Sequence, residues 1–166
     1  NINGAAVNVP YKIQLFDKEG LLITEKTGFT NFHAHRNTLV FEPTINTGKR
    51  IPAKATFEFT QAPVWFKSHD ALENIEMYDQ KYSEDNESSS FEVKVRNKSL
   101  YPYQNILLGT ILKDIEGNIV GFSRTIIDNI SPKNGEEIAS FTWPISRKGT
   151  VNSIELLPFI IPTLDR

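Results

Sequence analysis

Apolar and polar residues alternate with a period of two along most of the chain. Over residues 9–16 the odd positions are apolar, while Lys12 and Gln14 between them are polar. Because successive side chains of a β-strand point to opposite faces, this alternation predicts a strand with one buried face. The same pattern predicts strands over residues 21–26, 29–35, 38–45, 53–60, 91–96, 106–112, 119–125, 138–143 and 151–157. The predicted fold class is therefore all-β.

Residues 70–82 fit either a helix or a strand. Asp70 and Glu73 have the spacing of a helical capping box, and the apolar residues after them lie near helical spacing. Ile75 and Met77 fit the alternation of a strand equally well. The polar stretch that follows, residues 83–90, is predicted to be a flexible loop in both cases.

A short segment occurs twice, at an offset of 97 positions: residues 15–20 are LFDKEG and residues 112–117 are LKDIEG. In each copy an acidic turn ending in glycine precedes a further apolar stretch, which is typical of a β-hairpin. We interpret the chain as two copies of one all-β module, over residues 1–68 and 69–166, and a chance match is the alternative. A duplication predicts that residues 10–67 and 104–166 superpose strand for strand, with Asp17 and Asp114 at equivalent turns.

The first copy is predicted to lack its opening strands. The second copy has residues 72–97 ahead of its repeated segment, whereas the first has only residues 1–8, which we expect to be a loop. A sandwich without these strands leaves backbone N–H and C=O groups unpaired along an edge. We therefore expect an open edge beside residues 9–16 or 53–60, and the addition of a strand from a partner or from the parent chain there.

Composition narrows the class of protein further. The 166 residues include 23% charged and 39% hydrophobic residues, a globular mixture, and the formal net charge of −2 gives no electrostatic reason to expect nucleic acid. No apolar run is long enough to span a bilayer, so we expect no direct membrane insertion. The absence of cysteine excludes disulfides and thiolate sites. Because the chain begins at Asn1 without methionine, we expect a piece of a longer protein.

Few residues suggest catalysis or metal binding. His33 and His35 are two apart, so on a strand they would share a face, and His69 is a distant third candidate. We expect no structural metal, because two ligands do not close a tetrahedral shell. The acidic residues of segment 70–87 lack the glycine and spacing of a calcium loop, so we expect a solvated loop, with weak divalent binding as the alternative. Without a catalytic motif or cofactor motif, the chain is predicted not to be an enzyme and to need no cofactor.

Aromatic residues are the remaining candidates for an interaction site. They are Trp65, Phe66, Tyr101, Tyr103 and Trp143. Such rings could stack on a carbohydrate or dock a protein. The alternative is that they cap the cores of the two modules or fill the junction between them. Exposed, neighbouring tryptophans would favour a ligand site, and buried ones a scaffold.

At the two Asp-x-Glu-Gly turns the chain resembles the FxLYD-type domain, an immunoglobulin-like β-sandwich of bacterial extracytoplasmic proteins. The motif is carried by residues 13–17 (IQLFD) and more weakly by residues 110–114 (TILKD). Residues 96–99 (RNKS) are similar to the end of an earlier strand of the family. Residues 130–135 (ISPKNG) resemble the turn before the strand that ends at residues 141–144. The first half is also similar to the sandwich of late-embryogenesis-abundant, water-stress proteins.

The resemblance implies two tandem immunoglobulin-like β-sandwiches on a surface or envelope protein, with no catalytic residues to carry over. It also favours a strand over residues 72–82, because the family places its first strand there. The function it implies is that of a spacer, display or protein-interaction module located outside the cytoplasm. A glycan-binding module that uses exposed tryptophans is the alternative.

Overall fold

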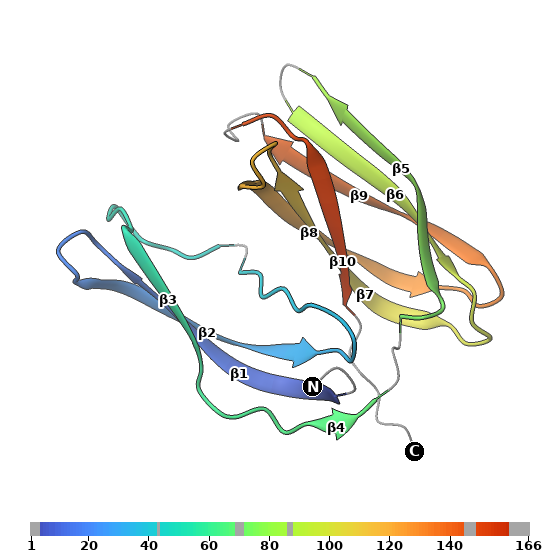
Figure 1. Cartoon of the computed structure of the whole chain (residues 1–166), viewed down its shortest axis with the longest axis horizontal. Helices are drawn as coiled ribbons and strands as arrows, with labels where there is room; N and C mark the ends of the chain where they lie inside the picture. Colours follow the sequence, from blue (N-terminus) through green and yellow to red (C-terminus); the bar gives the residue numbers. More distant parts are fainter. Residues whose placement is uncertain (1–3, 43, 69–71, 86–87, 145–148, 160–166) are drawn as a thin grey trace. The chain divides into compact units, whose positions relative to one another are not determined.

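The computed structural model describes residues 4–42, 44–68, 72–85, 88–144 and 149–159. These residues contain ten β-strands and no helix, and the strands pair in antiparallel fashion. This confirms the prediction of an all-β protein. The chain divides into two compact units, which we call unit 1 (described residues 4–68) and unit 2 (described residues 72–159). Figure 1 labels their strands.

Unit 1 has a single sheet within its described residues. Its strands are β1 (Gly4–Phe16), β2 (Leu22–Phe32), β3 (Lys54–Phe59) and the short β4 (Phe66–Lys67). Strand β1 lies between β2 and β3 and also pairs with β4 at its first residues. The predicted strands over 9–16, 21–26 and 53–60 are therefore present. Residues 4–8, which we expected to be a loop, belong to β1.

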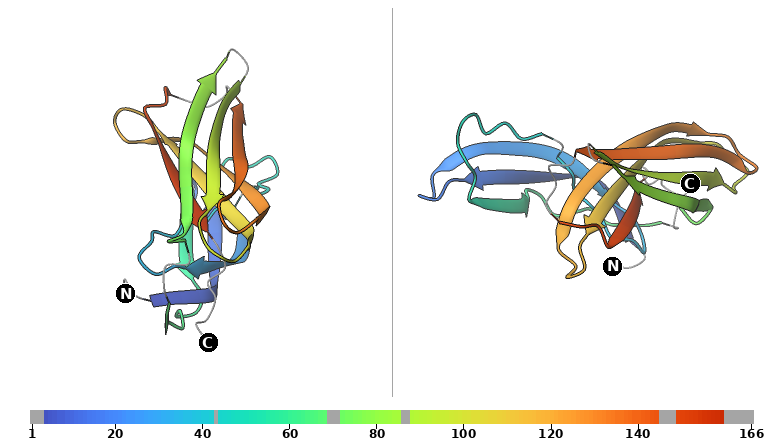
Figure 2. Two further views of the ribbon diagram at one scale, coloured as in Figure 1. Left: turned by 90° about the vertical axis from the view of Figure 1, so that its right-hand side faces the viewer. Right: turned by 90° about the horizontal axis from the view of Figure 1, so that it is seen from above.

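Unit 2 has two three-stranded sheets. One has the order β5 (Ile75–Glu84), β6 (Ser88–Asn97) and β9 (Gly135–Pro144). The other has the order β10 (Ser153–Phe159), β7 (Tyr103–Lys113) and β8 (Ile119–Ile130). Figure 2 shows the two sheets face to face, with β5, β6 and β9 in green to orange on one side.

The core of unit 2 fills the space between these two sheets. Strands β6 and β9 contribute Phe91, Val93, Val95, Ala139, Phe141 and Trp143, and β7 and β8 contribute Ile106, Leu108, Leu112, Ile127 and Ile130. Apart from Ile127 and Ile130, which are three positions apart in β8, these residues follow the period of two of their strands, since alternate side chains face the opposite sheet. The alternation seen in the sequence therefore encodes a core shared by two layers.

The repeated segment forms the same hairpin turn in both units. The backbone N–H of Asp17 donates to Leu21 O at 3.0 Å, and that of Asp114 donates to Asn118 O at 3.0 Å. Each aspartate Oδ1 accepts the backbone N–H four residues later at 2.8 Å. Gly20 and Gly117 close the turns with φ of +80° and +84°, which favours glycine. The prediction that Asp17 and Asp114 occupy equivalent turns is confirmed.

The equivalence extends into the strands on both sides of the hairpin. The order β2-β1-β3 of unit 1 matches β8-β7-β10 of unit 2. Val9 pairs with Thr30 and Ile106 with Ile127, so both strands keep the offset of 97. Asn8 and Asn105, also 97 apart, both have a φ of +53°. Three strands of each unit thus share one arrangement.

The prediction that the copies superpose strand for strand is wrong at residues 38–45. No described residue between β2 and β3 belongs to a strand, and this segment appears as a winding coil in Figure 1. Its counterpart in unit 2 is β9, which pairs along its whole length with β6. A strand needs a neighbour for its backbone N–H and C=O groups. The described part of unit 1 has no counterpart of β6, so these residues have no such neighbour.

Two further expectations concern residues 70–90. The ambiguous segment is a strand from Ile75 to Glu84, as the resemblance favoured, and the helix alternative is wrong. The predicted flexible loop over 83–90 is also wrong for most of its length, because β5 runs to Glu84 and β6 begins at Ser88. The Oγ atoms of Ser83 and Ser90 lie 2.8 Å apart across the pair. The polar residues here therefore belong to strand ends, and Ser89 among them is buried.

The hairpin turns allow a matched test of one electrostatic interaction. Arg50 donates a hydrogen bond to Asp17 and holds the pKa of that carboxyl below its ordinary value of 3.8. The pKa of Asp114 is also lowered, but by the side chain and backbone of Asn118. We expect Arg50→Gln to raise the pKa of Asp17 and leave that of Asp114 unchanged. An NMR titration of the side-chain carboxyl carbons measures both.

The sign of the effect on stability follows from the direction of the shift. A carboxyl whose pKa is lower in the folded state stabilises the fold above its unfolded pKa. That contribution is lost as the pH falls through the folded pKa, here below about pH 4. Arg50→Gln should therefore make the free energy of unfolding of unit 1 depend less on pH in the acid range. An unchanged Asp17 titration in the variant would contradict the assignment.

Candidate functional site

Five aromatic rings form a continuous row on one face of unit 1, which we call the aromatic row. Its members are Tyr11, Phe57, Phe59, Phe32 and Trp65, in spatial order. Successive ring centroids lie 5.6, 5.0, 5.4 and 5.3 Å apart. Distances of this size are those of interacting aromatic pairs. The row crosses β1, β3 and the end of β2, and it ends on the segment before β4.

The strand register explains why these rings meet. Tyr11 is paired with Phe59, and Ile13 with Phe57, so alternate residues of β1 and β3 share a face. On a sheet face, a side chain also reaches its diagonal neighbour on the next strand. This is the contact between Tyr11 and Phe57. Because Phe57 and Phe59 are two residues apart in β3, both rings lie on the same face as Tyr11, and this brings together three of the five rings.

The row is buried at one end and open at the other. Tyr11 is 5% exposed, and its hydroxyl donates to Glu42 of the coil that follows β2. Phe57, Phe59 and Trp65 are 46%, 42% and 46% exposed. Phe57 and Phe59 contact each other, and Phe32 links them to Trp65. Three large rings linked in this way and nearly half in water form an apolar patch, which commonly marks an interaction site.

The edge of the sheet beside these rings is also open. Strand β3 pairs only with β1 in the described residues. Thr60 N–H donates to Pro10 O at 3.0 Å, so the even-numbered residues of β3 direct their backbone groups toward β1. The backbone N–H and C=O groups of Ala55, Phe57 and Phe59 then point toward the open side. This geometry agrees with the expected open edge beside residues 53–60.

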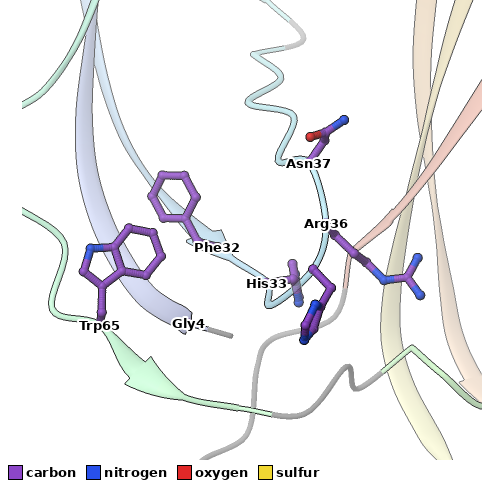
Figure 3. Close-up of a pocket in the computed structure, with 7 residues that line it drawn as sticks. Gly4, Phe32, His33, Arg36, Asn37 and Trp65 are labelled. Atoms are coloured by element: carbon purple, nitrogen blue, oxygen red, sulfur yellow. The ribbon is translucent and has the colours of Figure 1, made fainter. Parts of the chain in front are cut away.

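A hollow of about 390 Å³ lies beside the Trp65 end of the row. Figure 3 shows Trp65 and Phe32 side by side, with His33, Arg36 and Asn37 on the segment after β2. Gly4, His35 and these five residues line it. An indole with polar groups around it could stack on a sugar ring and bond its hydroxyls. Of the lining residues, Trp65, His33 and His35 were candidates in the sequence, whereas Phe32, Arg36 and Asn37 were not.

The other predicted aromatic residues do not join this site. Phe66 is half-buried in β4. Tyr101 is 76% exposed on a loop of unit 2, and Tyr103 packs against the core of that unit. Trp143 is only 5% exposed and lies between the sheets, where it stacks on Phe141. The two tryptophans therefore differ, since one is half in water and the other is a core residue.

The histidine pair does not share a strand face. Strand β2 ends at Phe32, so His33 and His35 lie in the turn that follows. His33 is buried, while His35 is exposed with a φ of +63°. The predicted strand over 29–35 is thus too long by three residues. His69 and Asp70 lie outside the described residues, and within those residues no three His, Asp or Glu side chains are grouped as metal ligands.

Acidic residues of β5 and β9 pair with cations. Arg96 lies between Glu76 and Glu136 on neighbouring strands, and its Nε donates to Glu136 at 2.7 Å. The pKa of Glu136 is lowered by the hydroxyl of Tyr78 and by Arg96. Lys94 binds Asp79 at 2.8 Å and lowers its pKa. These pairs form a cross-strand ladder on the solvent face of the sheet. The expectation of a solvated loop over the acidic segment 70–87 is therefore wrong for most of its length, because β5 runs from Ile75 to Glu84.

Comparison with known proteins adds no relative: no family model, curated protein or solved structure matches this chain. No helix among the described residues is long and apolar enough to cross a membrane. The structure alone therefore defines the fold class of this chain, which is an all-β protein with several antiparallel sheets.

Proposed function

We propose that this chain is a non-catalytic, protein-binding part of a bacterial surface or envelope protein, and that unit 1 provides the binding surface. The proposed architecture is two tandem immunoglobulin-like sandwiches, the first of which lacks its opening strands. The observation that carries the proposal is the half-exposed end of the aromatic row beside the open edge of β3. Aromatic side chains and unpaired strand edges are both common at protein interfaces.

A capture experiment with the full chain tests the proposal. The chain is immobilised and exposed to an envelope extract of the organism that makes it. We expect a bound protein that is lost when the extract is treated with protease and kept when it is treated with periodate. The double variant F57S/F59S should reduce capture by about tenfold or more, because buried aromatic anchors carry much of the energy of an interface.

Phe29→Ser is the matched control. Phe29 is 71% exposed on the opposite face of the same sheet, since its neighbour in register is Pro10 and not Tyr11. The control should capture as well as the parent chain does. Equal capture by F57S/F59S and the parent chain would contradict the proposed surface.

Glycan binding is the second candidate, because Trp65 and Phe32 border a hollow with Arg36 and Asn37 on its wall. This function predicts the opposite sensitivity. The bound material would be destroyed by periodate, and Trp65→Ala would abolish capture while F57S/F59S would not.

A further inference from the structure

The repeat within the chain shows what covers the equivalent sheet face in unit 2. Phe57 pairs with Ile13, and Leu156 pairs with Thr110 at the corresponding register position. Phe59 and Pro158 correspond in the same way. Leu156 packs against the core that β6 and β9 share with β7 and β8. In unit 2, then, this face is covered by a second sheet.

In unit 1 only part of that face is covered by described residues. The coil after β2 contacts the β1 and β2 side, where Glu42 accepts from the Tyr11 hydroxyl and lies 4.0 Å from Lys26. This coil is in the chain position of β9, which lies near β8 in unit 2. The side of the face over β3 has no such cover among the described residues. Ala55, Phe57 and Phe59 are exposed there.

The chemistry of the open area defines what fits it. Its β3 side chains are alanine and phenylalanine, while the charged Lys54 and Glu58 lie on the other face of the strand. An occupant therefore needs apolar side chains at every second position, as β6 has with Phe91, Val93 and Val95. The strand before β6 is joined to it as a hairpin.

A second copy of this chain cannot supply its own hairpin. Phe91, Val93 and Val95 are at most 2% exposed, because they are used in the core of unit 2. We propose that the β3 side of the aromatic row is the docking surface for an amphipathic β-hairpin of a separate partner protein, laid face to face on the sheet as β5 and β6 lie in unit 2. This inference rests on the proposed function and names the partner's structure.

A chimera tests whether the face accepts such a hairpin. Residues 72–100 are repeated directly ahead of Gly4, the spacing they have from Tyr101 in unit 2. Because the chain has no cysteine, Ala55→Cys introduces a single thiol on the face and Glu58→Cys one on the opposite face. We expect the added hairpin to slow the reaction of Cys at 55 with a disulfide reagent at least tenfold. Cys at 58 should react at an unchanged rate.

The matched control carries the same extension with the three apolar residues that correspond to Phe91, Val93 and Val95 replaced by serine, and it should give no protection. The amount of protease-sensitive protein captured by the chimera should also fall at least tenfold, since the added hairpin occupies the surface where the partner is proposed to bind. We expect the Ala55→Cys variant without the extension to sediment as a monomer and its thiol to react rapidly with the disulfide reagent.

Four results would overturn the inference. They are an unprotected thiol in the chimera, undiminished capture by the chimera, a parent chain that is a dimer with a protected thiol, and a monomeric parent chain that already protects it. Failure here is distinguishable from failure of the proposed function. Capture that depends on Phe57 and Phe59, combined with an unprotected thiol, would keep the function and reject the hairpin.

Discussion

Phe91→Ala is expected to lower the free energy of unfolding of unit 2 by about 3–5 kcal/mol, the range for removing a buried phenylalanine. Phe91 is 2% exposed and packs with Phe141 at a centroid distance of 6.0 Å. It projects from β6 into the core between the sheets, so its loss leaves a cavity that neither sheet can close alone. Urea denaturation measures the change.

The control for this variant is Phe122→Ala in β8 of the same unit. Phe122 is 53% exposed, so its truncation should cost about 1 kcal/mol or less. Similar losses for the two variants would show that β6 does not cover the core as described. The comparison also separates a loss of burial from the loss of an aromatic residue as such.

Asn97→Ala should destabilise unit 2 by about 2–4 kcal/mol, since it leaves several buried polar groups without partners. Asn97 is fully buried, and its Nδ2 donates to Tyr101 O at 2.7 Å and to Ile130 O at 3.3 Å. Its Oδ1 accepts from Ser99 N–H at 2.8 Å. One side chain thus joins the end of β6 to the following loop and to the end of β8.

Asn129→Ala is the matched control, because Asn129 is exposed in β8 beside Ile130. It should change stability by less than about 0.5 kcal/mol, as surface substitutions usually do. Thermal unfolding of both variants measures the difference. An Asn97→Ala protein as stable as the control would mean that water replaces all three hydrogen bonds.

The hairpins were predictable because their causes are local. The Asp and Gly of each turn are within a few residues of the groups they bond, so the repeat of LFDKEG and LKDIEG carries a repeat of structure. Alternation also located most strands. The repeated asparagine at positions 8 and 105 was a missed signal in the sequence. Both residues have a positive φ of +53°, which asparagine adopts more readily than most residues.

What could not be predicted depends on distant partners. Residues 38–45 have the alternation of a strand, yet the described residues among them form none without a neighbouring strand. The sequence does not show how exposed Trp65 and Trp143 are, and only the packing leaves Trp65 nearly half in water and places Trp143 in a core. The rest of the candidate site combines Phe32, Arg36 and Asn37 with Trp65, and the order of residues along the chain gives no indication of that contact.

The place of the β7–β8 hairpin in the chain bears on the order in which unit 2 folds. Asn97 of β6 pairs with Gly135 of β9, and the hairpin is the segment between them. Once it has formed, the free loop that must close shrinks from residues 98–134 to residues 98–102 and 131–134. The entropy of loop closure scales with the logarithm of loop length, so this lowers the cost of joining β6 to β9 by about 1 kcal/mol. The Asp114 turn therefore acts on the rate at which the second sheet assembles, whereas the described part of unit 1 has no pair of strands equivalent to β6 and β9 for the same turn to bring together.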